Sequence, residues 1–152
     1  MAISFKGAHF PSEVILMGVR WYVAYPLSTR HVEELMEERG VDVDHSTLKR
    51  WVIKYSPQLE EAFHRRKRPV WVSWRLDETY IKQVKYLNNV VEQDHRAVKR
   101  ITRPMLGFKA FDAAQCTLAG VELMYMMKKR QLVVEAGDEG RTAAAVFYSL
   151  AA

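Results

Sequence analysis

Hydroxyl and basic side chains recur on one side of the segment from His45 to Tyr55. The other side carries apolar residues at the i, i+3, i+4, i+7 spacing of a helix face. Hydroxyl, lysine and arginine side chains hydrogen-bond phosphates and guanine edges from the major groove of DNA. We therefore predict DNA contacts by the polar residues, the alternative being the solvated face of a plain three-helix bundle. The polar set is Ser46, Thr47, Lys49, Arg50 and Lys54, and the apolar set is Leu48, Trp51, Val52 and Tyr55.

A carboxylate interrupts an apolar run further along the chain. Residues 69–82 are rich in aromatic and β-branched side chains and read as a strand. Asp77 lies inside this run, and desolvating an unpaired carboxylate in a buried strand is costly. Two interpretations stay open: Asp77 serves a chemical role, or it marks a strand end or hairpin turn.

A second carboxylate, Glu92, begins a mixed charge pattern. Arg96, Lys99 and Arg103 follow it at spacings that put all four side chains on one helix face. We expect this helix to start at Asn88 or Asn89 and to end before Pro104 and Gly107. A second long helix is predicted over residues 111–130, and the tail from residue 131 is expected to be poorly ordered until its last few residues.

Three short helices precede these elements. Residues 12–25 are apolar almost all round, which is typical of a buried helix. Ser28 is a plausible N-cap for a helix over 29–39, and Gly40 a natural residue to end it. With the helix over 45–55 this predicts a helix-turn-helix. Ser56 and Pro57 interrupt the pattern, so a further helix is expected over 58–66.

Composition limits the class of protein. The chain has 152 residues, a net charge of +5 and one cysteine, which excludes an internal disulfide framework. No apolar run approaches the roughly 20 residues of a membrane span, and no signal peptide is apparent, so we expect a cytoplasmic protein. Between residues 82 and 109 there are 7 basic and only two acidic residues, a distribution that favours a polyanionic partner.

Three blocks of sequence resemble one known family. Residues 86–111, YLNNVVEQDHRAVKRITRPMLGFKAF, resemble the C-terminal part of the catalytic domain of bacterial insertion-sequence DDE transposases. Residues 74–82, WRLDETYIK, are similar to the family's first catalytic strand, and residues 5–51 look like its N-terminal DNA-binding region. The family's Glu followed seven residues later by Lys or Arg is present as Glu92 and Lys99. The order of the blocks matches as well.

The resemblance implies a metal-dependent site. In the family, three carboxylates hold two divalent ions, which activate the attacking oxygen and stabilise the leaving one. Asp77 takes the first acidic position and Glu92 the third, both as Mg²⁺ ligands, while Lys99 is implied to contact a phosphate near the active site. DNA contacts are expected from Arg96, Arg100 and Arg103.

The chain departs from the family between its two carboxylates. Only 14 residues separate Asp77 from Glu92, and apart from the adjoining Glu78, which strand alternation turns to the opposite face, none is acidic. The family has several strands, a helix and the second catalytic Asp in this interval. The sequence thus indicates an internally deleted transposase whose second carboxylate is missing.

These observations predict an α+β, mostly helical chain: an N-terminal helix-turn-helix region (1–68), a truncated RNase H-like remnant (69–130) and a tail (131–152). The implied function is that of a transposase that binds terminal inverted repeats and nominally cleaves and joins DNA, with impaired catalysis. The alternative is an inactive DNA-binding remnant that competes with intact transposase. Double-stranded DNA is the implied partner, as element ends and target. A homo-oligomer or a mixed oligomer with intact transposase is also implied, without membrane association and with nucleoid association when DNA is bound.

Overall fold

The computed structural model describes residues 3–67, 95–105, 107–108, 110–132 and 140–151, and these are mostly helical, as predicted. The sole β contact among the described residues is an isolated antiparallel bridge between Lys67 and Leu132. The predicted strand lies outside the described residues, and so do Asp77 and Glu92. The elements are α1 (Ser12–Ala24), α2 (Thr29–Glu37), α3 (His45–Arg66), a helical stretch over 95–102, the 3₁₀ helix η1 (Arg103–Met105), α6 (Phe111–Lys128) and α7 (Ala143–Ser149).

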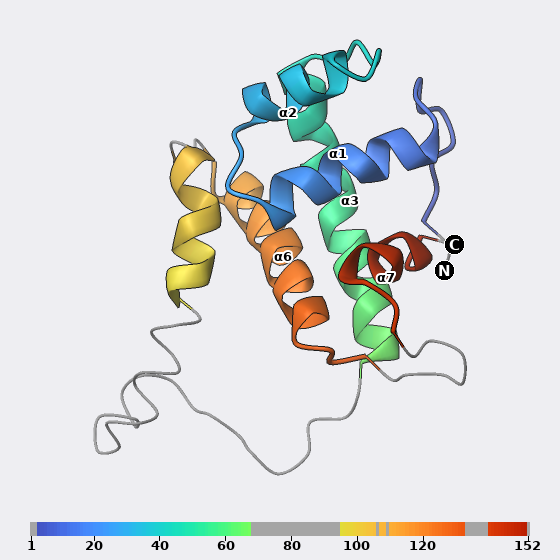
Figure 1. Ribbon diagram of the computed structural model, residues 1–152, viewed down its shortest axis with the longest axis vertical. Coiled ribbons are helices and arrows are strands. Elements are labelled where there is room, and N and C mark those ends of the chain that lie inside the picture. The colour runs from blue at the N-terminus through green and yellow to red at the C-terminus, as the bar shows by residue number, and fades with distance from the viewer. Residues whose placement is uncertain (1–2, 68–94, 106, 109, 133–139, 152) are drawn as a thin grey trace.

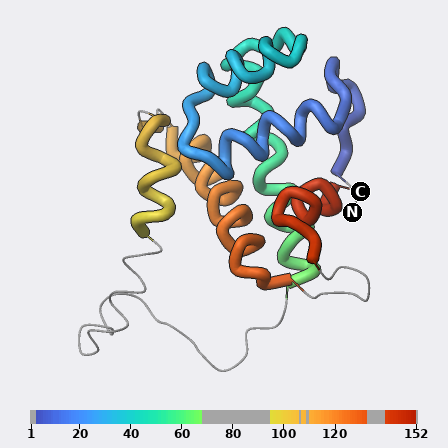
Figure 2. The backbone as a smooth tube through the Cα atoms, viewed as in Figure 1, coloured from blue at the N-terminus to red at the C-terminus, as the bar shows by residue number. Residues whose placement is uncertain are grey.

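The long helix α3 is the axis of the molecule (Figure 1). α1 crosses it and α2 packs near its N-terminal end, while α6 runs beside it in the same direction. α7 contacts α6 and α1, and Arg66 at the end of α3 donates a hydrogen bond to Ser149 C=O in α7. The backbone trace shows the N-terminal segment reaching the same side as the end of α7 (Figure 2). Helices from both ends of the sequence therefore share one core.

That core explains the helix patterns. α1 buries residues on most of its circumference, in agreement with the prediction of a buried helix. All four apolar residues predicted to face inward from the first half of α3 are buried. Two aromatic pairs fix the N-terminal segment on α3: Phe5 stacks on Tyr55 at 5.0 Å between ring centroids, and Phe10 meets Trp51 edge-on at 5.2 Å.

The expected break at Ser56 and Pro57 is wrong, because α3 is continuous from His45 to Arg66. Proline lacks the N–H that would bond the carbonyl four residues earlier. The next carbonyl, that of Lys54, accepts an additional bond from the Gln58 side-chain amide at 2.8 Å. The apolar stripe also continues through Leu59 and Phe63, which have no exposed surface. Burial of this stripe outweighs the single lost hydrogen bond.

A close approach joins α6 to α3 and α1. A Cβ placed on Gly120 would lie 2.7 Å from Ser56 Oγ and 2.7 Å from Val23 Cγ1, so only glycine fits between these helices.

The observed α6 ends at Lys128, two residues before the predicted end at Arg130.

The C-terminal tail contains a helix that the sequence analysis did not anticipate. Thr142 caps α7 by accepting a hydrogen bond from Ala145 N–H, and Phe147 is completely buried. Among the described residues, no helix is long and apolar enough to cross a membrane.

Candidate nucleic-acid interface

The N-terminus of α3 is capped by Asp44. Its carboxylate accepts a hydrogen bond from Ser46 N–H at 2.8 Å, which satisfies one of the helix's open donors. Desolvation raises the pKa of Asp44, but the hydrogen bonds from Ser46 and Thr47 and the charge of His45 lower it by more. The pKa of Asp44 therefore lies below its ordinary value. Ser46, one of the residues predicted to contact DNA, therefore also takes part in the helix cap through its backbone N–H.

The turn before this cap is fixed at both ends of α2. Ser28 forms a capping box with His31: Ser28 Oγ accepts a hydrogen bond from His31 N–H, and His31 Nδ1 accepts one from Ser28 N–H. At the other end Gly40 has φ of 75° and donates to Glu37 C=O, while Val41 donates to Met36 C=O. This is the Schellman pattern, and it confirms Gly40 as the glycine of the turn that follows α2, although the helix itself ends at Glu37 and not at the predicted Arg39.

The three N-terminal helices meet at a second close approach. A Cβ on Gly18 of α1 would lie 2.9 Å from Leu48 Cδ2 on α3 and 2.9 Å from Met36 Cε on α2. Beside it, the Arg39 guanidinium lies 4.8 Å above the Trp21 ring. α1 therefore holds α2 and α3 at a fixed separation, and this sets the direction in which α3 projects.

The polar residues predicted to contact DNA lie on the outside of this arrangement. Ser46, Lys49, Arg50 and Lys54 are exposed and Thr47 is half-buried. Lys54 Nζ lies 4.9 Å from the Tyr55 ring, which orients the lysine along the helix surface. From His45 to Leu59 the helix contains no acidic residue. The face can thus present hydrogen-bond donors to an anionic partner without a carboxylate of the same segment beside them; its contact with DNA stays a prediction.

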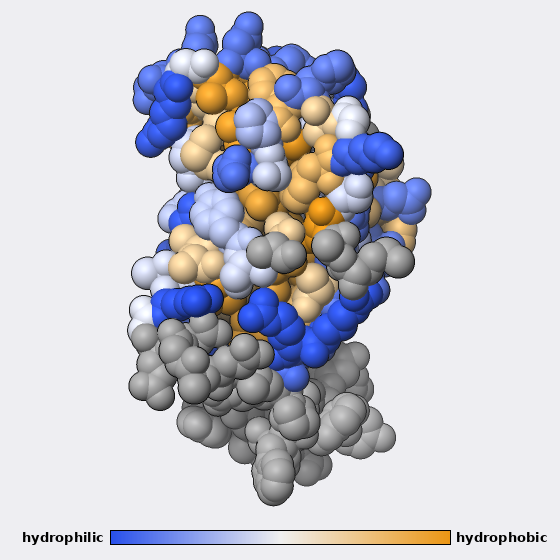
Figure 3. Space-filling model, turned by 90° about the vertical axis from the view of Figure 1, so that its right-hand side faces the viewer, coloured by the Kyte–Doolittle hydropathy of each residue, from blue (hydrophilic) through white to orange (hydrophobic). Residues whose placement is uncertain are grey.

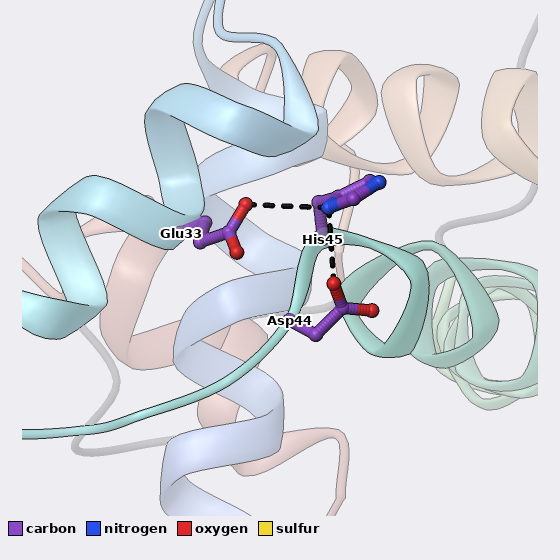
Figure 4. Close-up of side chains that lie close together, drawn as sticks. All are labelled: Glu33, Asp44 and His45. Atoms are coloured by element: carbon purple, nitrogen blue, oxygen red, sulfur yellow. Dashed lines mark ion pairs between the residues drawn. The ribbon is translucent and has the colours of Figure 1, made fainter.

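One cluster of side chains at this site was missed by the sequence analysis. His45 Nδ1 lies 3.4 Å from Glu33 Oε2 and 3.0 Å from Asp44 Oδ1, linking α2 to the start of α3 (Figure 4). The spacing of Glu33, Asp44 and His45 would permit a metal ion. An imidazole does not suit Mg²⁺, and the Asp44 carboxylate already caps α3, so this cluster does not fit the family's magnesium.

The second predicted group lies on the stretch over 95–102 and on η1. Lys99, Arg96, Arg100 and Arg103 are exposed there, whereas Ile101 is buried and Val98 packs against the core. The structure thus describes Lys99 of the predicted catalytic set, while Asp77 and Glu92 lie outside the described residues. Their assignment as ligands and that of Lys99 as a phosphate contact stay predictions.

Comparison with known proteins gives consistent matches. A family model described as a DDE domain matches residues 82–131. The chain is 27% identical over 203 positions to the transposase for insertion sequence-like element IS431mec of Staphylococcus aureus strain Mu50, and equally to that of strain N315. It is 26% identical to the transposase for insertion sequence element IS257 in transposon Tn4003 of Staphylococcus aureus. Each alignment covers 83% of this chain and 89% of the relative. No solved structure matches.

The alignment lengths bear on the predicted deletion. The alignment extends over 203 positions, whereas 83% of 152 residues is about 126 residues, so about 77 positions of the relatives (203 minus 126) face no residue of this chain. A gap of this size inside the aligned span agrees with an internally shortened chain. These matches support the resemblance of this chain to the bacterial insertion-sequence DDE transposases.

Proposed function

We propose that this chain binds the terminal inverted repeats of an insertion sequence through the exposed face of α3. The observation that carries the proposal is the basic stripe of Lys49, Arg50 and Lys54 at the capped end of a helix held by α1 and α2. A helix presented in this way, as the second of two helices joined by a tight turn, suits entry into a major groove. Its first half would read bases, and the cap region would contact phosphates.

The proposed function also has a catalytic part. Mg²⁺, where bound by Asp77 and Glu92, would supply activation of the attacking oxygen and stabilisation of the leaving one during cleavage and strand transfer. Because the chain has no second carboxylate of the family's set, we propose that its cleavage activity is strongly impaired. Lys99 would then orient a phosphate without completing the reaction. The site of action would be DNA in the bacterial cytoplasm.

The test uses labelled DNA that carries the element's terminal inverted repeat, with Mg²⁺, analysed on matched native and denaturing gels. The wild type is expected to shift the DNA without cutting it. Lys49→Ala and Arg50→Ala are each expected to weaken binding by about 5- to 150-fold, the effect of losing one specific contact. Lys6→Ala removes the same charge from an exposed position outside α3 and is the matched control.

Several results would contradict the proposal. Unchanged binding by the α3 variants, with melting temperatures equal to that of the wild type, would exclude α3 as the reading helix. Specific cutting that is lost in Asp77→Ala would show that the shortened chain retains a working site.

A second candidate function is competition with intact transposase. The motivating observation is the complete, well-capped α3 in a chain that lacks the family's second carboxylate. A chain that occupies the repeats without cutting them would lower the activity of a full-length enzyme added to the same DNA. Equal inhibition by wild type and by the double variant Lys49→Ala/Arg50→Ala would exclude this form of competition.

A further inference from the structure

The junction of α2 and α3 brings three metal-binding side chains together, apart from the predicted magnesium ligands. His45 Nδ1 lies 3.4 Å from Glu33 Oε2 and 3.0 Å from Asp44 Oδ1, and one ligand atom of each residue lies within 4.8 Å of those of the other two. Figure 4 shows the Glu33 side chain reaching from α2 toward the two residues at the start of α3. The three donors thus come from both helices of the predicted helix-turn-helix.

The cap of α3 leaves one oxygen of Asp44 available to a metal ion. Asp44 accepts the capping hydrogen bond from Ser46 N–H through Oδ2, whereas Oδ1 is the oxygen that faces His45. The two oxygens of a carboxylate can serve two different partners. An ion on Oδ1 is therefore compatible with the helix cap.

An ion pair between His45 and the two carboxylates leaves a negative charge without a partner. Two carboxylates carry two negative charges, and a protonated imidazole offsets one of them. No lysine or arginine among the described residues forms an ion pair with Glu33 or Asp44, although the chain has 23 Lys and Arg for 18 Asp and Glu. A divalent cation on the neutral imidazole would offset both charges.

The donor set and its spacing indicate the class of ion. Zn²⁺ binds imidazole nitrogen and carboxylate oxygen at about 2.0–2.2 Å, and a tetrahedron of that radius places neighbouring ligand atoms about 3.3–3.6 Å apart. The two separations from His45 Nδ1 are close to this value, and the Glu33 and Asp44 side chains are 35% and 56% exposed, so they can adjust the third. Mg²⁺ prefers an octahedral set of oxygen ligands and suits these donors less well.

We propose that Glu33, Asp44 and His45 bind a zinc-type divalent ion that joins α2 to the start of α3. Figure 3 shows strongly hydrophilic side chains at the upper end of the molecule, where Figure 1 places α2, so an ion can reach this end from solution. Solvent water would complete the tetrahedral set. An ion held between two helices of the folded chain binds the unfolded chain less tightly and therefore stabilises the fold.

The experiment titrates the untagged full chain with ZnCl₂ in an isothermal calorimeter, with and without a large excess of MgCl₂. His45→Gln and Glu33→Gln each remove one ligand and leave Asp77 and Glu92 in place. Each is expected to weaken Zn²⁺ binding by at least about 10- to 100-fold, since the loss of an outer-shell partner alone costs that much.

His64→Gln is the matched control. His64 Nε2 lies 3.7 Å from Glu60 Oε1 on α3, but no second carboxylate joins this pair among the described residues. The control is therefore expected to bind Zn²⁺ like the wild type. Zn²⁺ at 100 times its Kd should raise the melting temperature of the wild type by roughly 5–10 °C, and that of the two ligand variants by much less.

Four results would overturn the site or its ion. Equal Zn²⁺ affinity in the wild type and in either folded ligand variant excludes the site, and so does a wild type that binds no Zn²⁺. A loss of affinity in His64→Gln as large as that in His45→Gln would show unspecific binding to surface histidines. Displacement of Zn²⁺ by the excess of Mg²⁺ would exclude the zinc-type ion. Either ligand variant is decisive alone, and DNA binding enters none of these measurements, so the outcome is independent of the proposed function.

Discussion

The N-terminal helices and the C-terminal helices are held in place by different means. α2 and the start of α3 are fixed by caps and a Schellman turn, all made by residues close in sequence. α6 and α7 are fixed by contacts with residues far away, at Gly120 and Phe147. The exposed face of α3 that is proposed to contact DNA is thus positioned by capping and turn residues close in sequence. The positions of α6 and α7, by contrast, depend on packing against distant parts of the chain.

The largest expected effect tests the docking of α7. Phe147→Ala empties a fully buried position and is expected to lower the free energy of unfolding by about 3–5 kcal/mol. The melting temperature measured by circular dichroism should then fall by roughly 6–20 °C. Phe111→Ala is the matched control, since Phe111 is 81% exposed and its loss should change stability by less than about 0.5 kcal/mol. Equal melting temperatures for the two variants would show that α7 contributes nothing to the fold.

The next effect tests the contact between the two regions. Gly120→Ala gains helix propensity but forces Val23 and Ser56 apart, for an expected net loss of about 1–2 kcal/mol in chemical denaturation. Ser56→Ala is expected to be neutral or stabilising, because the buried Ser56 hydroxyl has no hydrogen-bond partner among the described residues. The double variant should recover part of the loss. A Gly120→Ala protein as stable as the wild type would contradict the close approach of α6.

Sequence reasoning succeeded where the signal is local. Ser28, Gly40 and the apolar repeat of Leu48 and Val52 each predict structure from a few neighbouring residues, and the structure confirms them. It failed at Pro57 and in the tail. A proline normally ends a helix, and only distant contacts of the following apolar residues show that α3 continues.

The candidate site divides in the same way. The exposure of Lys49 and Arg50 follows from helix periodicity and could be predicted. The position of His45 between Glu33 and Asp44 depends on how α2 meets α3, which spacing along the chain does not show. The resemblance to a family predicts Asp77 and Glu92 as ligands, which composition and periodicity alone left open, and this assignment stays a prediction because both residues lie outside the described residues.

The smallest expected effect concerns the acid stability of the reading helix. The pKa of Asp44 is lowered in the folded chain, so its ionised form stabilises α3 above the ordinary value of 3.8. This contribution is lost as pH falls through the folded value, where the carboxylate gains a proton. Asp44→Asn keeps a capping oxygen without the charge. Near pH 5 the wild type should have a higher melting temperature than Asp44→Asn. The difference between the two should shrink near pH 3, because only the wild type loses a charged cap on acidification. Parallel pH curves for the two proteins between pH 5 and pH 2 would show that the Asp44 charge does not support the cap, and that the start of α3 depends on α1 and α2 alone.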